Sequence, residues 1–426
     1  MDTSQAANAA NIAKWVTEAG LTGMMELELL HGFCNRLVAG GVPVARVNIV
    51  IDTLHPIHEG RVFRWRRDDQ GDVDHVVEYG RTNVEGEAAA NWRRSTYYHL
   101  LVSGEDFLRR RIGPGHVEDF SVLADLRAEG QTDYFALIHR FEAEGVIGEM
   151  DSFYSSWTTD VESGFADEQV SLIRELASPL MLALKCASLA RIAKTLVETY
   201  LGRDAGRLVL KGRIARGVTD RIQAVLWYSD LRSFTHITEN ADPEQIIPFL
   251  NDYAEAIISS IYEAGGDVLK LVGDGTLAIF KEDDPSQACR SGLRAEQLMR
   301  SRIRVLNRNR LASNLPVADA YLGLHIGEVF YGNIGSQDRL DFTVVGPAVN
   351  EVSRIATLCR SVERDVLVSS SFFAAASTSE QERLVSVGRY ALRGVNRPQE
   401  LFTLDPSWME DDKPEQAQGN KTTSNR

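Results

Sequence analysis

The sequence predicts an α+β protein: a small α+β domain, a helical connection, and a second domain with a ferredoxin-like β-α-β-β-α-β core. Three observations predict this. Short runs of β-branched residues alternate with amphipathic stretches in both halves. Leucines recur at helical spacing between the halves. The strand and helix order changes near residue 212. The predicted parts are residues 1–185, a helical dimerisation linker at 186–211, the second domain at 212–404, and a disordered polar tail at 405–426.

Composition narrows the class of protein. The 426 residues are 44% hydrophobic and 25% charged, as in ordinary globular proteins. The formal charge of -14 argues against a nucleic-acid surface and against adhesion to an anionic membrane. The four scattered cysteines do not predict disulfides or a zinc site. We found no signal peptide and no apolar run long enough for a membrane span, and these features predict a cytoplasmic protein.

The first domain is predicted to open with helix over residues 1–30. Runs rich in β-branched and aromatic residues then predict short strands at 46–53, 62–65, 73–79, 97–102, 134–141 and 152–158. Gly164 begins a loop that leads into a helix.

That helix carries a repeat of apolar residues at three- and four-residue spacing, at Leu172, Leu176, Leu180, Leu189, Ile192, Leu196 and Tyr200. The spacing is typical of a coiled-coil seam. For residues 172–184, packing on the first domain is an equal alternative. For 189–201 no domain remains to be covered, so a dimer linker is predicted. Pro179 is expected to kink the helix, and Gly202 and Gly206 to end it.

The second domain is predicted from clear boundary signals. Asp242 and Pro243 mark a helix start, and Gly265-Gly266 mark its end. The expected strands are 221–228, 268–272, 276–280, 321–326, 341–345, 366–369 and 400–404, and the expected helices are 242–262, 286–303 and 350–359.

This topology brings two carboxylates together. The first and third strands of such a sheet are antiparallel neighbours, so the end of strand one, at Asp230, lies beside the hairpin turn that carries Asp274. Two adjacent carboxylates repel each other unless a cation compensates them, and Mg²⁺ prefers such oxygen ligands. The alternative is that Asp274 only serves the turn and Asp230 only caps the next segment.

Four segments resemble the motifs of class III nucleotidyl cyclases, in the family's order and over about 200 residues. They are SDLRSFT (229–235), GGDVLKLVGDGTLAIF (265–280), HIGEVFYGNIG (325–335) and DFTVVGPAVNEVSR (341–354). The resemblance implies an adenylate cyclase that converts ATP to cyclic AMP and pyrophosphate in a head-to-tail homodimer. It implies that Asp230 and Asp274, with the Leu231 carbonyl, hold two Mg²⁺ or Mn²⁺ ions.

The resemblance also assigns the substrate contacts. Lys270 and Thr343 would read the base, where many relatives carry Asp in place of the threonine. This Lys/Thr pair favours ATP over GTP and is similar to the subclass often activated by bicarbonate. Phe234 would contact the substrate as well.

The remaining substrate contacts come from the second half of the domain. Asn350 would orient the ribose, and Arg354 would stabilise the pentavalent phosphate. Arg393 or Arg397 would contact the terminal phosphates.

Two positions depart from the family pattern. Ser233 stands where the first motif usually has glycine, and a positive φ there would cost about 1–2 kcal/mol. Thr343 is the other departure. The alternatives are a guanylate or diguanylate cyclase, or a non-catalytic nucleotide-binding module. The hairpin sequence argues against a diguanylate cyclase. The non-catalytic module would predict that Asp230, Asp274, Asn350 or Arg354 is lost.

The first domain carries no comparable catalytic signature. Its element order resembles GAF-like or PAS-like sensory domains, which implies an unknown small-molecule effector acting through the linker. His55 and His58 could suggest a metal site but are more simply loop histidines. The aromatic residues could line a pocket, but core filling is the more general explanation; they are Trp65, Trp92, Tyr97, Tyr98 and Trp157.

Overall fold

We describe the protein from a computed structural model. It describes residues 3–69, 71, 74–81, 86–141, 147–148, 150–393, 395 and 398–406. The chain divides into two compact units, Met1–Leu196 and Val197–Arg426, and the division falls within the stretch predicted as the linker. Each unit is described by itself.

The first unit is built on an antiparallel sheet with strand order β3-β2-β1-β6-β5-β4. Its strands are β1 Arg46–Asp52, β2 Gly60–Arg66, β3 Val76–Tyr79, β4 Phe107–Arg111, β5 Asp133–Arg140 and β6 Ser152–Thr159. Its helices are α1 Thr3–Leu21, α2 Glu26–Ala39, α3 Glu87–Arg93, α4 Thr96–Ser103, α5 Ser121–Ala128 and α6 Asp167–Leu201.

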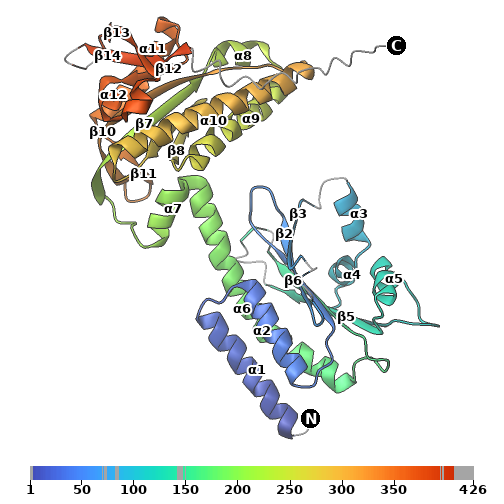
Figure 1. The fold of residues 1–426 in the computed structure, drawn as a ribbon. Coiled ribbons are helices and arrows are strands. Elements are labelled where there is room, and N and C mark those ends of the chain that lie inside the picture. Colours follow the sequence, from blue (N-terminus) through green and yellow to red (C-terminus); the bar gives the residue numbers. More distant parts are fainter. Residues whose placement is uncertain are drawn as a thin grey trace, which may run out of the picture. The chain divides into compact units, whose positions relative to one another are not determined.

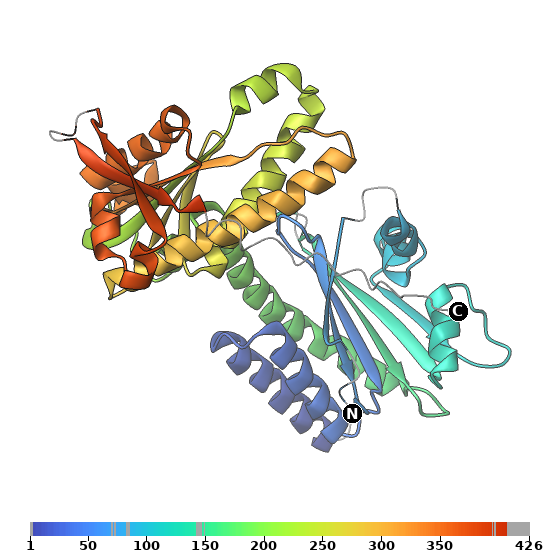
Figure 2. The same cartoon turned by 45° about the horizontal axis from the view of Figure 1, so that its top comes forward.

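Helices cover both faces of this sheet (Figure 2). The α1, α2 and α6 helices pack on one face, where Phe33, Trp157 and Ile173 are fully buried. The α4 and α5 helices pack on the other, through Leu100 and Leu123.

The aromatic residues singled out from the sequence belong to these two cores. Trp65 and Trp157 are buried in the first core, and Trp92 and Tyr97 pack against the second. Tyr98 lies edge-on to the Trp92 ring. Core filling therefore explains these side chains.

One predicted strand is wrong. Residues 97–102 form helix α4, because Ser95 accepts a hydrogen bond from the Tyr98 amide and so caps a helix at this point. The α3, α5 and β4 elements were not predicted from the sequence, because they are short and carry weak periodicity.

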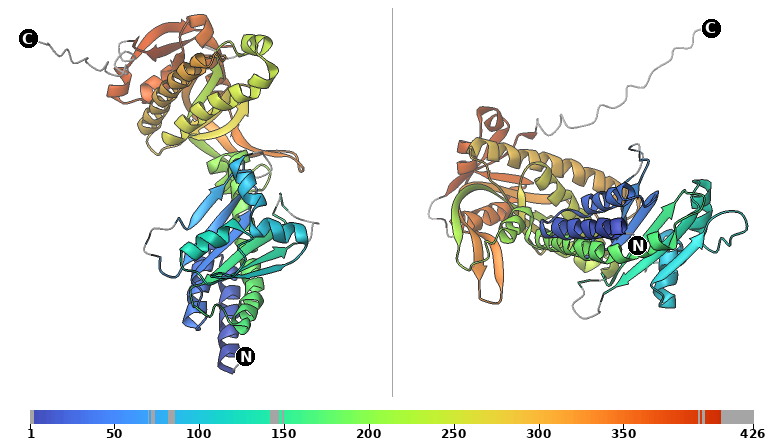
Figure 3. Two further views of the ribbon diagram at one scale, coloured as in Figure 1. Left: turned by 90° about the vertical axis from the view of Figure 1, so that its right-hand side faces the viewer. Right: turned by 90° about the horizontal axis from the view of Figure 1, so that it is seen from below.

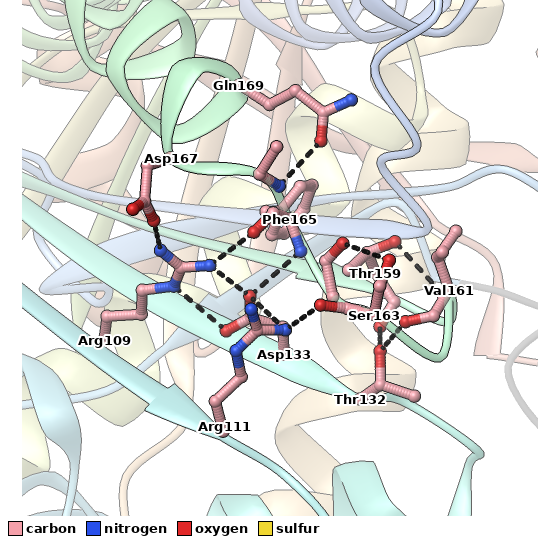
Figure 4. A network of polar contacts seen from close by, with 12 residues as sticks. Arg109, Arg111, Thr132, Asp133, Thr159, Val161, Ser163, Phe165, Asp167 and Gln169 are labelled. Atoms are coloured by element: carbon pink, nitrogen blue, oxygen red, sulfur yellow. Dashed lines mark hydrogen bonds and ion pairs between the residues drawn. The ribbon is translucent and has the colours of Figure 1, made fainter.

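A buried carboxylate ties the start of α6 to the sheet (Figure 4). Asp133 is fully buried, and its Oδ2 accepts bonds from the Arg109 guanidinium at 2.7 Å and the Phe165 amide at 3.0 Å. Arg109 also donates to Asp167 at the first turn of α6. The network anchors the entry of this long helix to β4 and β5.

The helix α6 packs on the first unit over most of its length. Leu176 and Leu180 are buried in the first core, so this stretch packs on the first domain, which was one of its two predicted alternatives. Leu189, Ile192 and Leu196 also pack against that core, so the expectation that nothing remained for them to cover is wrong. The reason is that α2 begins beside this part of α6.

Three further expectations concern breaks in the helical connection. The α6 helix runs continuously through Pro179 and ends at Leu201. Gly202 adopts a φ of 86° there. Gly206 does not end a helix, because it lies inside α7, Arg203–Leu210.

The second unit contains the predicted β-α-β-β-α-β core (Figure 1). The strand order is β13-β14-β12-β10-β7-β9-β8, and β11 pairs with β10. The strands are β7 Thr219–Leu231, β8 Asp267–Val272, β9 Gly275–Phe280, β10 Ala320–Gly335, β11 Leu340–Val345, β12 Val366–Ser369, β13 Leu384–Tyr390 and β14 Gln399–Leu404. The helices besides α7 are α8 Phe234–Asn240, α9 Pro243–Glu263, α10 Pro285–Ala312, α11 Pro347–Val362, α12 Ser370–Ala375 and α13 Thr378–Gln381.

Two cores flank this sheet. The α9 and α10 helices lie side by side on one face and bury Tyr253 and Leu293 against Trp227. On the other face α7, α11 and β11 pack over the sheet through Ala205, Val352 and other apolar residues. The second half of β10 pairs with β11 as a hairpin (Figure 3).

The sequence predicted the elements of this core well. Asp242 caps α9 by accepting a bond from the Glu244 amide, as its position before Pro243 predicted. The α8, α12, α13 and β13 elements were not predicted. All but the first two residues of the tail predicted from 405 lie outside the described residues.

Two global expectations can also be compared with the structure. All four cysteines are free, and three of them are buried. In the described part of the chain, no helix combines the length and the hydrophobicity that a membrane crossing requires.

Candidate active site

Two carboxylates meet at the end of β7. The β7 and β9 strands are antiparallel neighbours with Ser229 opposite Thr276, which places Asp230 beside the β8–β9 turn that carries Asp274. The Leu231 amide donates to Asp274 Oδ2 at 3.2 Å. The pairing predicted from topology is therefore present, and Asp274 does more than shape its own turn.

The electrostatics of this pair suit a divalent cation. Burial, together with the charge and hydrogen bond of Asp274, raises the pKa of Asp230 to about 6. No cationic side chain among the described residues forms an ion pair with either carboxylate. Because hard cations bind carboxylate and carbonyl oxygens, Asp230, Asp274 and the Leu231 carbonyl fit Mg²⁺ or Mn²⁺.

Ser233 lies just after this pair in the left-handed region, with φ 61° and ψ 24°. The conformation explains why the related motif usually has glycine there, since a side chain at positive φ is strained. The Ser233 side chain makes no capping hydrogen bond with α8 that would offset this strain.

The two predicted base-reading residues lie on neighbouring elements. Lys270 of β8 forms an ion pair with Asp341 of β11, two residues before Thr343. A register shift at Leu269 in the β8–β9 pairing places Lys270 opposite Leu277. Neither this bulge nor the ion pair was predicted from the sequence.

Asn350 and Arg354 lie one turn apart on α11, as their spacing predicted. This helix packs closely on β10 at Gly323, where an added Cβ would lie 2.6 Å from the Val352 carbonyl oxygen. The buried His325 lies under the same helix and contacts Ser369 Oγ at 2.9 Å through Nδ1. The close packing at Gly323 holds the helix that carries Asn350 and Arg354.

Two further predicted substrate contacts, Phe234 and Arg393, lie in different environments. Phe234 packs against the second unit's core and stacks on Phe249, with ring centroids 6.3 Å apart. Arg393 is exposed. Arg397, its alternative, lies outside the described residues.

The predicted site residues form two groups within one chain. Asp230 and Asp274 form one, and Lys270 and Thr343 lie with the β10–β11 hairpin in the other. Across the described residues, no hydrogen bond or ion pair joins the two groups. Of the two loop histidines considered as a metal site, His58 pairs with Glu78 and its ring stacks on that of His55. The described residues contain no cluster of three or more His, Cys, Asp or Glu side chains suited to a metal.

The strand order of the second unit and its paired carboxylates agree with the resemblance to class III nucleotidyl cyclases. Residues 219–406 match the family described as the adenylate and guanylate cyclase catalytic domain. The similarity to this family covers residues 219–406, which are less than half of the chain. The first unit lies outside the match.

Similar proteins include both adenylate and guanylate cyclases. An adenylate cyclase of Anabaena cylindrica is 33% identical over 159 residues, which are 36% of this chain and 31% of the relative. An uncharacterized protein of Mycobacterium tuberculosis is 28% identical over 212 residues, 49% of this chain and 37% of the relative. The match spans about a third of the length of these curated relatives.

Solved structures to which the chain is similar include an adenylyl and a guanylyl cyclase. The adenylyl cyclase CyaB of P. aeruginosa is 23% identical, with a TM-score of 0.41 over 44% of this chain and 96% of that chain. The guanylyl cyclase Cya2 is 28% identical, with a TM-score of 0.38 over 44% of this chain and 93% of that chain.

Proposed function

We propose that the protein is an adenylate cyclase that converts ATP to 3′,5′-cyclic AMP and pyrophosphate. The observation that carries the proposal is the pair of carboxylates, Asp230 and Asp274, at the edge of a domain of the cyclase family. In this reaction the 3′-oxygen bonds to the α-phosphorus, and the bond from that phosphorus to the leaving pyrophosphate breaks.

The roles of the residues follow from their chemistry. Asp230, Asp274 and the Leu231 carbonyl hold divalent cations, which when bound would neutralise the triphosphate and favour the 3′-alkoxide. Arg354 stabilises the charge that develops on the transferred phosphorus, because a guanidinium matches phosphate oxygens bidentately. Asn350 orients the ribose. Catalysis of this kind is mostly positioning and charge stabilisation, so no side-chain nucleophile is needed.

The active enzyme is proposed to be a homodimer. No hydrogen bond or ion pair joins the two groups of site residues within the described part of one chain. A second copy would bring Lys270, Asn350 and Arg354 to the carboxylate pair of the first. The first unit is proposed as a sensory domain for a small-molecule effector, and bicarbonate remains a proposed activator.

Adenine is favoured over guanine because Lys270 matches the lysine that adenylate cyclases of this family use, and because one relative is named an adenylate cyclase. A guanylate cyclase is the second candidate, since similar solved structures include a guanylyl cyclase.

The test is turnover by the full-length protein with ATP or GTP and Mn²⁺, with the product identified by mass. We expect cyclic AMP from ATP and loss of product in Asp274→Asn. Lys270→Glu should lower the preference for ATP over GTP. No cyclic product from either nucleotide, or equal turnover by Asp274→Asn, would refute the proposal.

A further inference from the structure

A groove of about 410 Å³ lies between the end of β5 and helix α6 in the first unit. Two stripes of side chains face each other across it. The stripe on α6 recurs at three- and four-residue spacing, and the opposite stripe comes from alternate positions at the end of the strand. These residues are Ser178, Met181, Leu182 and Lys185 on α6, and His139 and Phe141 on the other side. The groove has the size of pockets that bind small organic molecules.

Lys185 is the cation that this groove offers to a ligand. Its ammonium lies 3.8 Å from the centroid of the Phe141 ring, and it forms no hydrogen bond or ion pair with any residue that the structure describes. The other charged residues of the lining are engaged elsewhere. Asp106 lies 3.9 Å from the Arg174 guanidinium, and Arg140 donates to two backbone carbonyl oxygens. One positive charge therefore remains for a ligand.

His139 adds an unsatisfied polar atom to the same groove. Its Nδ1 is buried and has no hydrogen-bond partner within the described part of the chain. Burial lowers the pKa of His139, although the charge of Asp106 opposes this, so the ring is neutral at pH 7 and one of its nitrogens donates. A buried polar atom without a partner is destabilising, and an acceptor oxygen of a ligand would satisfy it.

The rest of the groove is apolar. Leu182 is 64% exposed at this surface, whereas Met181 beside it is only 2% exposed. Phe141 packs against the first core from the strand side. A ligand with an apolar body can cover these side chains. A polyanion such as a nucleotide would need several cations, and the lining offers only Lys185.

We propose that this groove binds a small monocarboxylic acid with an apolar body. The carboxylate accepts hydrogen bonds from Lys185 and His139, and the body of the ligand packs on Phe141 and Leu182. The inference rests on the proposed sensory role of the first unit, for which it names the chemical class of the effector. It does not depend on the reaction that the second unit catalyses.

The position of the groove gives a bound acid a route to α6. Pro179 lies inside this helix, next to Ser178 of the lining. Because proline has no N–H, the carbonyl of Glu175 lacks its usual helical partner, and the helix is weakened at this point. A ligand that joins α6 to β5 here restricts the helix.

The test measures binding of 3-phenylpropionate to the full-length protein by isothermal titration calorimetry, without nucleotide. The neutral 3-phenylpropionamide has nearly the same shape and serves as the matched probe. We expect one acid bound per chain, with an affinity roughly 10-fold or more above that of the amide, because hydrogen bonds to charged groups are the stronger ones.

Variants of α6 assign the charge preference to one residue. Lys185→Met should abolish the preference for the acid and leave the Kd of the amide near the wild-type value, and Lys185→Gln serves if that variant does not fold. Lys194→Met is the matched control, because Lys194 is an exposed lysine of the same helix outside the groove. It should change neither Kd.

Two further measurements test the rest of the site. Leu182→Ser, at an exposed position, should weaken both probes. Hydrogen exchange of α6 peptides that span residues 171–185 should slow when the acid is bound.

Several outcomes would overturn the inference. They are no saturable binding of the acid at millimolar concentration, equal affinities of acid and amide in the wild type, and equal effects of Lys185→Met and Lys194→Met. Binding without slower exchange in α6 would place the site elsewhere and would overturn it as well. A failure of any of these leaves the adenylate cyclase proposal standing, and a wild type that forms no cyclic AMP from ATP leaves this inference standing.

Discussion

Ser233 offers a direct test of how the loop after the carboxylate pair is built. Its φ of 61° lies in the left-handed region, and its side chain makes no hydrogen bond that caps α8. Glycine has no Cβ and adopts this conformation without steric cost. Ser233→Gly should therefore stabilise the second unit.

The size of the effect is a difference of two contributions. The left-handed conformation costs a residue with a Cβ about 1–2 kcal/mol. The greater freedom of glycine in the unfolded chain offsets about 0.5–1 kcal/mol of this. The free energy of unfolding of the second unit should thus rise by about 0.5–1 kcal/mol.

Hydrogen exchange of peptides from β7 and β9 measures this unit by itself. In the variant, exchange through global unfolding should slow by about 2- to 5-fold. Ser233→Ala is the matched control, because it removes the hydroxyl and keeps the Cβ, so its exchange should not slow. Glu363→Gly is a positive control at another place in the unit, because Glu363 also has positive φ, 54°, but follows α11. Exchange should slow in this variant as well. Faster or unchanged exchange in Ser233→Gly, with slowing in Glu363→Gly, would refute the reasoning about this loop.

Three further predictions concern buried charges. Asp274→Asn removes one of two facing carboxylates, so the Tm measured without metal should rise. The additional rise in Tm on adding Mn²⁺ should be smaller in the variant than in the wild type. An equal rise with Mn²⁺ in both proteins would contradict the metal assignment. The pKa of Asp204 is lowered from 3.8 because hydrogen bonds, led by that of Lys281, outweigh the effect of burial. The stabilisation by the Asp204 carboxylate should therefore be complete above about pH 4 and lost as pH falls further. In urea unfolding, the free energy of unfolding of Asp204→Asn should be lower than that of the wild type by about 3 kcal/mol at pH 7 and by less at pH 3. Arg191→Met leaves the buried Glu26 carboxylate without its cationic partner and should cost about 3–5 kcal/mol. The double variant that adds Glu26→Gln should lose less, and equal losses would show that the ion pair contributes little.

Local signals in the sequence identified most of the second unit. Asp242 before Pro243 marks the start of α9, and Gly265-Gly266 mark its end. The alternation of β-α-β-β-α-β then fixed which strands are neighbours, and so the meeting of Asp230 and Asp274. The prediction succeeded because strand order in this topology follows from the order along the chain.

The first unit was less predictable. Residues 97–102 are rich in aromatic and β-branched side chains, yet they form α4, because a cap at Ser95 and packing on the sheet outweigh strand propensity. The first half of the α6 repeat had two interpretations, and the second half, predicted to have no domain to cover, packs on the first core as well. This packing depends on α2, whose position no local pattern reveals.

By itself, the sequence determined the type of the second domain, the residues of its motifs and the departure of Ser233 from the usual glycine, because these depend on residue identity and order. The positive φ that strains Ser233 is known only from the structure. Only the tertiary structure decided that Lys270 pairs with Asp341 and that Thr343 is largely buried. The bulge at Leu269 and the packing of the β10–β11 hairpin set both, and such contacts arise from side chains distant in the sequence.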